Sequence, residues 1–270
     1  MSYIYDVKAK LYDEYLLFKK QIISIVVPTI ILIYIFGGVT RNLAYYLTNP
    51  TGRLNDIGYD IIPEFGNNFR FLSDVCMYII TGLGCTVLLL PIFYKPNLQS
   101  ISTVNMGLRI IHVLTIGQFL RSITYLSTAI PPSSEHCQID SPNYNPPTTI
   151  SQLFFTYPSG MNSSCGDQIF SGHILQDITF ILHIFRNSNG VFLRNKKLTY
   201  GFCIISSILF ILQVIFILGD RNHYSVDIIV GTYTTFGVWY IYNNIYPYDN
   251  GNRLITFDEK PLLDVHVIEV

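Results

Sequence analysis

The sequence CGDQIFSGH, at Cys165–His173, ends a long polar loop and runs directly into an apolar stretch. About fifty residues further along, RNHYSVD at Arg221–Asp227 again joins a polar connector to an apolar run. Each motif therefore places one histidine, His173 or His223, close to the start of an apolar segment. Asp227 follows His223 by four residues, so on a helix the two side chains share a face and can touch.

The composition indicates a membrane protein. Half of the residues are hydrophobic and only 13% are charged, whereas soluble domains carry roughly 25% charged residues. Several stretches of about 20 residues are apolar all round, which is the length needed to cross roughly 30 Å of hydrocarbon. A net charge of −1 with no basic block gives no support for a nucleic-acid partner.

We predict an all-α polytopic membrane protein with six transmembrane helices, at residues 21–39, 75–94, 110–130, 168–185, 199–219 and 224–246. Residues 1–20 form a cytosolic N-terminal segment without a cleavable signal peptide, 21–246 the transmembrane catalytic domain, and 247–270 a cytosolic tail. The fourth span is the most polar, with Ser171, His173, Gln176, Asp177 and His183. These side chains should face other helices, because ionisable groups are costly against lipid.

The basic residues set the orientation, because cytosolic connectors carry an excess of Lys and Arg. With a cytosolic N-terminus, most of the 17 basic residues lie in cytosolic pieces, and the lumenal loop 131–167 contains none. The opposite side keeps Arg41, Arg53, Arg70, Arg121 and Arg221. Six spans return the C-terminus to the cytosol. The fourth and sixth spans then start on the same exoplasmic or lumenal face, so both motif histidines lie there at similar depth.

The spacing of these residues predicts a nucleophile paired with an acid/base. A carboxylate on one ring nitrogen of His223 fixes its tautomer and leaves the other nitrogen free to attack. His173 would protonate a leaving alkoxide and then accept a proton from the incoming hydroxyl. Asp177, four residues after His173, is a candidate to orient that ring; the alternative is a hydrogen bond between helices unrelated to catalysis.

The other histidines suggest structural roles. His112 and His183 lie on the cytosolic halves of their spans, and His136 and His266 lie in a loop and in the tail. Zinc is the competing use of a His/His/Asp set. The spacing offers no helical His-x-x-x-His pair, so neither a metal nor another cofactor is expected.

Cys-Gly-Asp-x-x-x-Ser-Gly-His at 165–173 and His-Tyr-Ser-x-Asp at 223–227 resemble the two signature motifs of the sphingomyelin synthase family. This family includes ceramide phosphoethanolamine synthases and the inositol phosphorylceramide synthases of plants and protists. A weaker similarity extends to Asp56-x-x-x-Asp60-x-x-Pro63 and to the segment from Arg121-x-x-Thr124 through Pro131. The resemblance covers most of residues 55–245. The chain departs from the family at Ile174, where the family usually has threonine.

The resemblance implies a catalytic triad of His173, His223 and Asp227 in a lipid-phosphatase-like helical core, with the site facing the lumen or the exterior. It also implies the reaction: a phospho-head group passes from a glycerophospholipid to the primary hydroxyl of ceramide, with release of diacylglycerol. A phosphate in such a site needs positive charge around its oxygens. The predicted substrate-binding residues are Arg121, Arg221, Asn222, Tyr224, Asp167 and Ser171.

The head group stays open between inositol, choline and ethanolamine. Relatives that handle choline or ethanolamine tend to carry an acid just before the second-motif histidine, where this chain has Asn222. Arg221 and Asn222 favour a neutral polyol, so phosphatidylinositol is the preferred donor. Asp220 keeps phosphatidylcholine as an alternative.

Two other functions remain as alternatives. The first is a lipid phosphate phosphatase, whose signatures also need an Arg-Pro pair, absent here, and an arginine at the position of Ile217. The second is a non-catalytic lipid-binding membrane protein. A lumenal site implies secretory membranes, so we expect the Golgi or the plasma membrane.

Two further features of the lumenal loop concern modification. Cys137 and Cys165 bracket the loop and form either a disulfide, which an oxidising compartment permits, or two free thiols. The sequence Asn162-Ser163-Ser164 is a glycosylation acceptor on the appropriate side of the membrane.

Overall fold

The structure is a computed structural model, and it describes residues 2–48, 52–65, 71–93, 102–142, 144–155, 165–192 and 195–246. Within these ranges all regular elements are helices, in agreement with the predicted all-α class. The glycosylation sequence and the C-terminal tail from 247 lie outside the described residues.

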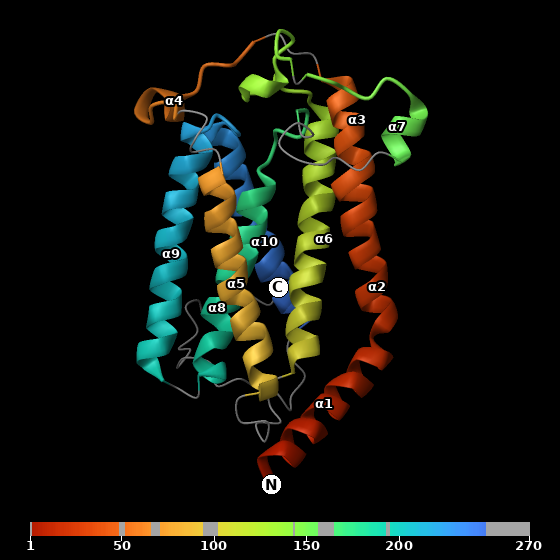
Figure 1. Cartoon of the computed structure of the whole chain (residues 1–270), viewed down its shortest axis with the longest axis vertical. Coiled ribbons are helices and arrows are strands. Elements are labelled where there is room, and N and C mark those ends of the chain that lie inside the picture. Colours follow the sequence, from red (N-terminus) through yellow and green to blue (C-terminus); the bar gives the residue numbers. More distant parts are fainter. Residues whose placement is uncertain are drawn as a thin grey trace, which may run out of the picture.

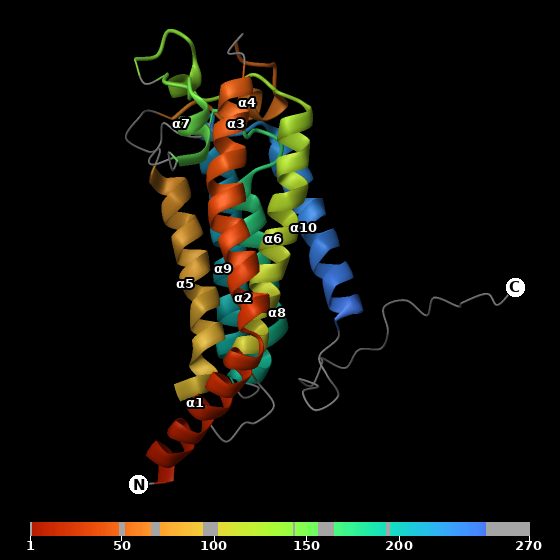
Figure 2. The ribbon, with the colours of Figure 1, turned by 90° about the vertical axis from the view of Figure 1, so that its right-hand side faces the viewer.

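Long helices stand side by side and form an elongated bundle (Figures 1 and 2). The first is a continuous rod, Ile22–Leu47, made of α2 (Ile22–Ile30), the π-helix η1 (Ile31–Val39) and α3 (Thr40–Leu47). The others are α5 (Phe71–Phe93), α6 (Thr103–Ser127), α8 (Gly172–Val191), α9 (Lys196–Gly219) and α10 (Ser225–Ile245). The short helices α4 (Ile57–Ile61), η3 (Glu135–Cys137) and α7 (Ile150–Phe155) lie in the connectors at one end of the bundle.

Three of the long helices are apolar and long enough to cross a membrane: Ile22–Leu47, Phe71–Phe93 and Lys196–Gly219. The 20 residues of α8 also extend about 30 Å at 1.5 Å per residue, but this helix is more polar. It packs against α5, α6, α9 and α10. Asp177 and His183 are buried there, as predicted for ionisable residues that face protein instead of lipid.

The first span is longer than the sequence predicts. It was expected to end at residue 39, but the helix continues to Leu47 because protein groups satisfy the polar residues that follow. The Thr40 hydroxyl lies 2.5 Å from the Tyr125 hydroxyl of α6, and the Asn42 amide donates to backbone carbonyls of α7. Arg41, expected in a connector, therefore lies within the helix.

The predicted N-terminal segment is itself a helix, α1 (Ser2–Lys20), which leaves the bundle at an angle (Figure 1). Its buried Glu14 accepts hydrogen bonds from the Ser102 hydroxyl (3.0 Å) and from the backbone N–H groups of Thr103 (3.1 Å) and Val104 (2.9 Å). The first N–H groups of a helix have no partner within the helix. Glu14 therefore caps α6 from another element.

We predict that Glu14→Ala lowers the free energy of unfolding by about 1–2 kcal/mol, because the first turn of α6 loses its acceptor. Thermal unfolding of the purified protein in detergent measures the effect. The matched control is Asp13→Ala, which removes an exposed neighbouring acid. Equal stability of the two variants would contradict the capping role.

Candidate active site

The second motif folds as the turn between α9 and α10. His223 Nδ1 lies 3.1 Å from Asp227 Oδ2, in the first turn of α10. The same carboxylate oxygen accepts the N–H of Tyr224 at 3.0 Å. Asp227 is completely buried and His223 nearly so. The carboxylate thus fixes one ring nitrogen and leaves Nε2 as the free nitrogen of His223.

The first motif brings His173 to the start of α8, opposite His223. The centroids of the two imidazole rings are 6.5 Å apart. The backbone also joins the two motifs, since the N–H of Ser171 donates to the carbonyl of Asp227 at 3.2 Å. The two histidines therefore lie together, and the starts of α8 and α10 beside them are at the end of the bundle opposite α1 (Figure 1).

The acidic partner of His173 is Asp74, which the sequence analysis did not identify. His173 Nε2 lies 3.0 Å from Asp74 Oδ1, in the first turn of α5. The sequence left two roles open for Asp177, orienting His173 or a hydrogen bond between helices, and the structure shows neither: Asp177 is fully buried, and neither of its carboxylate oxygens has a hydrogen-bond partner within the described part of the chain. The ring of His173 turns towards α5 instead of following its own helix.

A signal for Asp74 was present in the sequence. The second span runs in the same direction as the fourth and sixth, so an acid at its start lies on the same face as both histidines. The predicted span began at residue 75, which left this acid in the preceding connector.

A buried ion-pair cluster lies beside the histidines. Asp167 Oδ2 is 2.6 Å from Arg121 Nη2 and 3.3 Å from Arg41 Nε. Arg121 also donates to the backbone carbonyls of Asp167 and Phe170. Burial alone would raise the pKa of the Asp167 carboxyl, but the two guanidinium groups outweigh it and hold this pKa below its usual value. Asp167 is therefore a carboxylate that orients two arginines.

Arg121 is close to the first motif histidine. A Cβ atom added to Gly172, the residue before His173, would lie 3.4 Å from the guanidinium carbon of Arg121. Of the predicted substrate-binding residues, Arg121, which is paired with Asp167, thus lies beside the residue that precedes His173.

The remaining predicted substrate-binding residues make structural contacts. Arg221 donates to the carbonyls of Leu218 and Tyr59, and its guanidinium carbon lies 4.1 Å from the Tyr59 ring centroid. Tyr224 is 2% exposed, and its hydroxyl donates to the carbonyl of Pro131 and accepts from the N–H of Leu54. These contacts hold the connectors in place.

The two smaller polar candidates are engaged similarly. The Ser171 hydroxyl is fully buried and accepts the N–H of Ile174, so it caps α8. Asn222 Oδ1 accepts from the Ser134 hydroxyl at 3.4 Å in the 131–142 connector.

The segment 52–65 clamps the turn that carries His223. Asp56 Oδ2 accepts the N–H of Ser225 at 2.9 Å, and its Oδ1 accepts the Ser225 hydroxyl at 2.7 Å. The Tyr59 hydroxyl donates to the carbonyl of His223 at 3.0 Å, and burial raises the pKa of this phenol. The weaker Asp56–Pro63 similarity therefore corresponds to a segment that fixes the start of α10.

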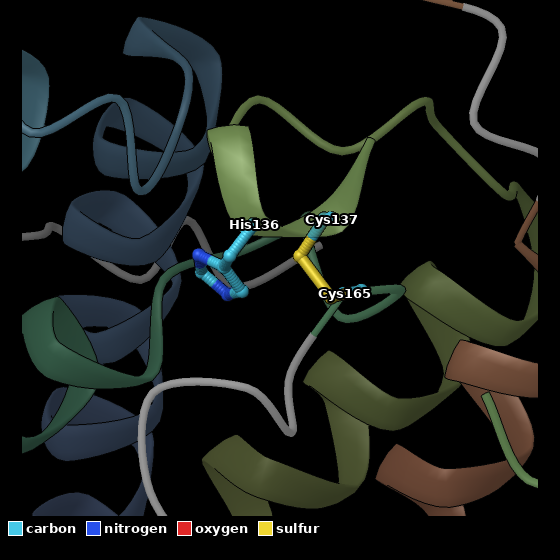
Figure 3. Close-up of side chains that lie close together, drawn as sticks. All are labelled: His136, Cys137 and Cys165. Atoms are coloured by element: carbon cyan, nitrogen blue, oxygen red, sulfur yellow. A yellow bond between two sulfur atoms is a disulfide. The ribbon is translucent and has the colours of Figure 1, made fainter. Parts of the chain in front are cut away.

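Each residue of the Cys-Gly-Asp triplet holds the first motif in place. Cys165 forms a disulfide with Cys137 (Figure 3), so of the two alternatives, a disulfide or two free thiols, the structure has the disulfide. His136 lies beside this disulfide, but the two bonded sulfurs offer no thiolate to a metal. A Cβ atom on Gly166 would come within 2.2 Å of the Ala44 carbonyl oxygen, so the turn packs directly on the backbone of α3.

Two imidazoles that face each other, each with a carboxylate partner and with an arginine nearby, form a suitable site for phosphoryl transfer. One ring can attack phosphorus and the other can move protons. The fold and the site together define a helical, membrane-type phosphoryl-transfer enzyme.

Comparison with known proteins makes this class more specific. Residues 164–244, which include both motifs, match the family model described as PAP2 superfamily C-terminal. The chain is 30% identical over 237 residues to the phosphatidylinositol:ceramide inositolphosphotransferase of Oryza sativa subsp. indica, covering 84% of this chain and 68% of that protein. The chain belongs to the sphingomyelin synthase family.

Other members of the family are also similar. Phosphatidylinositol:ceramide inositolphosphotransferase 3 of Arabidopsis thaliana is 30% identical over 200 residues, which cover 73% of this chain and 65% of that protein. Phosphatidylcholine:ceramide cholinephosphotransferase 1 of Caenorhabditis elegans is 24% identical over 243 residues, or 84% of this chain and 47% of that protein.

We predict that Gly166→Ala costs about 1–3 kcal/mol of stability and reduces activity, because the added methyl group forces the Cys-Gly-Asp turn away from α3. Thermal unfolding and the lipid-transfer assay described below measure the two effects. Gly237→Ala is the matched control, since a Cβ atom there meets nothing within 4 Å. A Gly166→Ala protein that behaves like this control would refute the close approach.

Proposed function

We propose that the protein transfers phosphoinositol from phosphatidylinositol to the primary hydroxyl of ceramide and releases diacylglycerol. The observation that carries the proposal is the pair of imidazoles 6.5 Å apart, each with its own carboxylate. Membership of the sphingomyelin synthase family supports a ceramide phosphotransferase of sphingolipid biosynthesis.

The proposed chemistry has two steps. In the first, His223 Nε2 attacks phosphorus, the bond from phosphorus to the diacylglycerol oxygen breaks, and His173 gives its proton to that oxygen. In the second, the ceramide hydroxyl returns a proton to His173 and attacks the phosphohistidine, which releases His223. Asp227 stabilises the charge that develops on His223, and Asp74 holds His173 through Nε2, so Nδ1 is the nitrogen that exchanges the proton.

Inositol remains our preferred head group for two reasons. The rice and Arabidopsis relatives are named as inositolphosphotransferases, whereas the nematode relative, at lower identity, is named as a cholinephosphotransferase. In addition, Asp220, the acid that favoured choline, is buried at 4% exposure, so it is poorly placed to meet a cationic ammonium group.

The proposed topology has six spans, with the site facing the lumen or the exterior and both termini in the cytosol. Residues 1–20 precede the catalytic domain 21–246, with its lumenal loop 131–167, and 247–270 form a cytosolic tail. The Cys137–Cys165 disulfide supports this orientation, because it lies at the same end as the histidines and disulfides persist in oxidising compartments. Golgi or plasma membrane is the corresponding proposed location.

We predict that the purified protein, given labelled ceramide, forms product with phosphatidylinositol at a rate at least about tenfold above that with phosphatidylcholine or phosphatidylethanolamine. Chromatography of the labelled lipid identifies the product. Product from phosphatidylcholine alone would reject inositol. Inorganic phosphate released from phosphatidate without a ceramide product would instead identify a lipid phosphate phosphatase.

We predict that His223→Ala and Asp227→Ala abolish transfer, and that Asp74→Asn slows it at least tenfold, because acid–base help is worth roughly 10²–10⁴-fold in rate. Asp177→Asn is the matched control: it changes a carboxylate on the helix of His173 that does not contact this histidine. Similar losses in Asp74→Asn and Asp177→Asn would contradict the assignment of Asp74. Function retained after replacement of both histidines would identify a non-catalytic lipid-binding protein.

A further inference from the structure

Arg41 is a second arginine at the ion-pair cluster, and it comes from the first long helix. Its side chain shares one carboxylate oxygen of Asp167 with Arg121. Two guanidinium groups around a single carboxylate leave one unit of positive charge in the cluster. This charge lies close to the catalytic residues, because Arg121 borders Gly172, next to His173.

The two arginines differ in exposure. The side chain of Arg121 is 5% exposed and that of Asp167 6%, whereas Arg41 retains 24%. Most donors of Arg121 already serve Asp167, Phe170 and Gln118. Arg41 is therefore the more exposed arginine of the cluster.

Hydrogen bonds of the neighbouring residues hold the helix segment that carries Arg41 in place. Its neighbour Thr40 bonds to Tyr125 of α6, and its other neighbour Asn42 bonds to the carbonyls of Gln152 and Leu153. The π-helix η1 ends immediately before this segment and changes the angular phase of α3 relative to α2. Isolated π-turns within helices often occur at functional sites.

The first motif is held against the same part of α3. Gly166 packs on the Ala44 carbonyl, one turn after Arg41, and the Thr48 hydroxyl closes the contact by donating to that carbonyl. Arg41 and Asp167 are thus brought together by backbone packing as well as by charge.

We propose that Arg41 binds the phosphate of the donor lipid together with Arg121; this inference rests on the proposed transfer of a phospho-head group. A phosphodiester carries one negative charge, and more charge collects on its oxygens when His223 attacks phosphorus. Arginine donors at that position stabilise the transition state. Arg221, which the sequence also predicts at the substrate, donates instead to the carbonyls of Tyr59 and Leu218.

The test compares Arg41→Gln with wild type in two measurements. The first is the KM for phosphatidylinositol at fixed ceramide, expected to rise about 10- to 100-fold with the loss of a charge-assisted hydrogen bond. The second is thermal stabilisation of the purified protein by inorganic phosphate without lipid substrate, expected to fall by at least half. The matched control is Arg186→Gln, which removes an exposed arginine thirteen residues after His173 on α8, and should behave as wild type in both.

Wild-type behaviour of Arg41→Gln in either measurement would overturn the proposal, as would an equal loss in Arg186→Gln. If Arg41→Gln does not fold, Arg41→Lys replaces it: lysine keeps the charge but loses the planar fork, so an unchanged KM for phosphatidylinositol would then reject the contact. A wild-type protein that makes no ceramide product from any donor would refute the proposed function. The phosphate stabilisation experiment would still decide the role of Arg41.

Discussion

Asp227 joins the two halves of the site. Its carboxylate contacts the His223 ring and accepts the N–H of Tyr224, while its backbone carbonyl accepts the N–H of Ser171 from the other motif. A buried carboxylate loses its hydration, and this cost is offset only where several well-directed donors surround it. Asp227 is therefore the residue that is bonded to both motifs and sets how far apart they lie.

Most of the polar residues in the signature motifs stabilise the frame around the histidines. Cys165 is bonded to Cys137, Gly166 allows the turn to approach α3, and Ser171 caps α8. Asp56 fixes the start of α10 by accepting two hydrogen bonds from Ser225. In the proposed reaction one ring bonds phosphorus while the other moves protons, so both rings must be held to within a fraction of an ångström. This requirement explains why so many residues fix the two turns.

The sequence was sufficient for the all-α class, for the shared side of the two histidines and for the His223–Asp227 contact. These predictions rest on the length of apolar stretches, the distribution of basic residues and a four-residue spacing. Each of these can be read from neighbouring residues or summed along the chain. These properties do not identify contacts between residues of distant helices. Asp74 lies one residue before the predicted second span and Arg41 two residues after the predicted first span, so small boundary errors placed both in connectors. Asp177 was a candidate partner because it shares a helix with His173, but this ring contacts Asp74 of α5.

The Cys137–Cys165 disulfide makes the anchoring of the site depend on oxidation of two cysteines. It anchors the 131–142 connector two residues before Asp167, the carboxylate that aligns Arg41 and Arg121. Thiols remain reduced in the cytosol and pair in the secretory pathway. In the proposed lumenal orientation, a newly synthesised chain therefore completes the anchoring of the turn that carries Asp167 only after this loop has been translocated and oxidised.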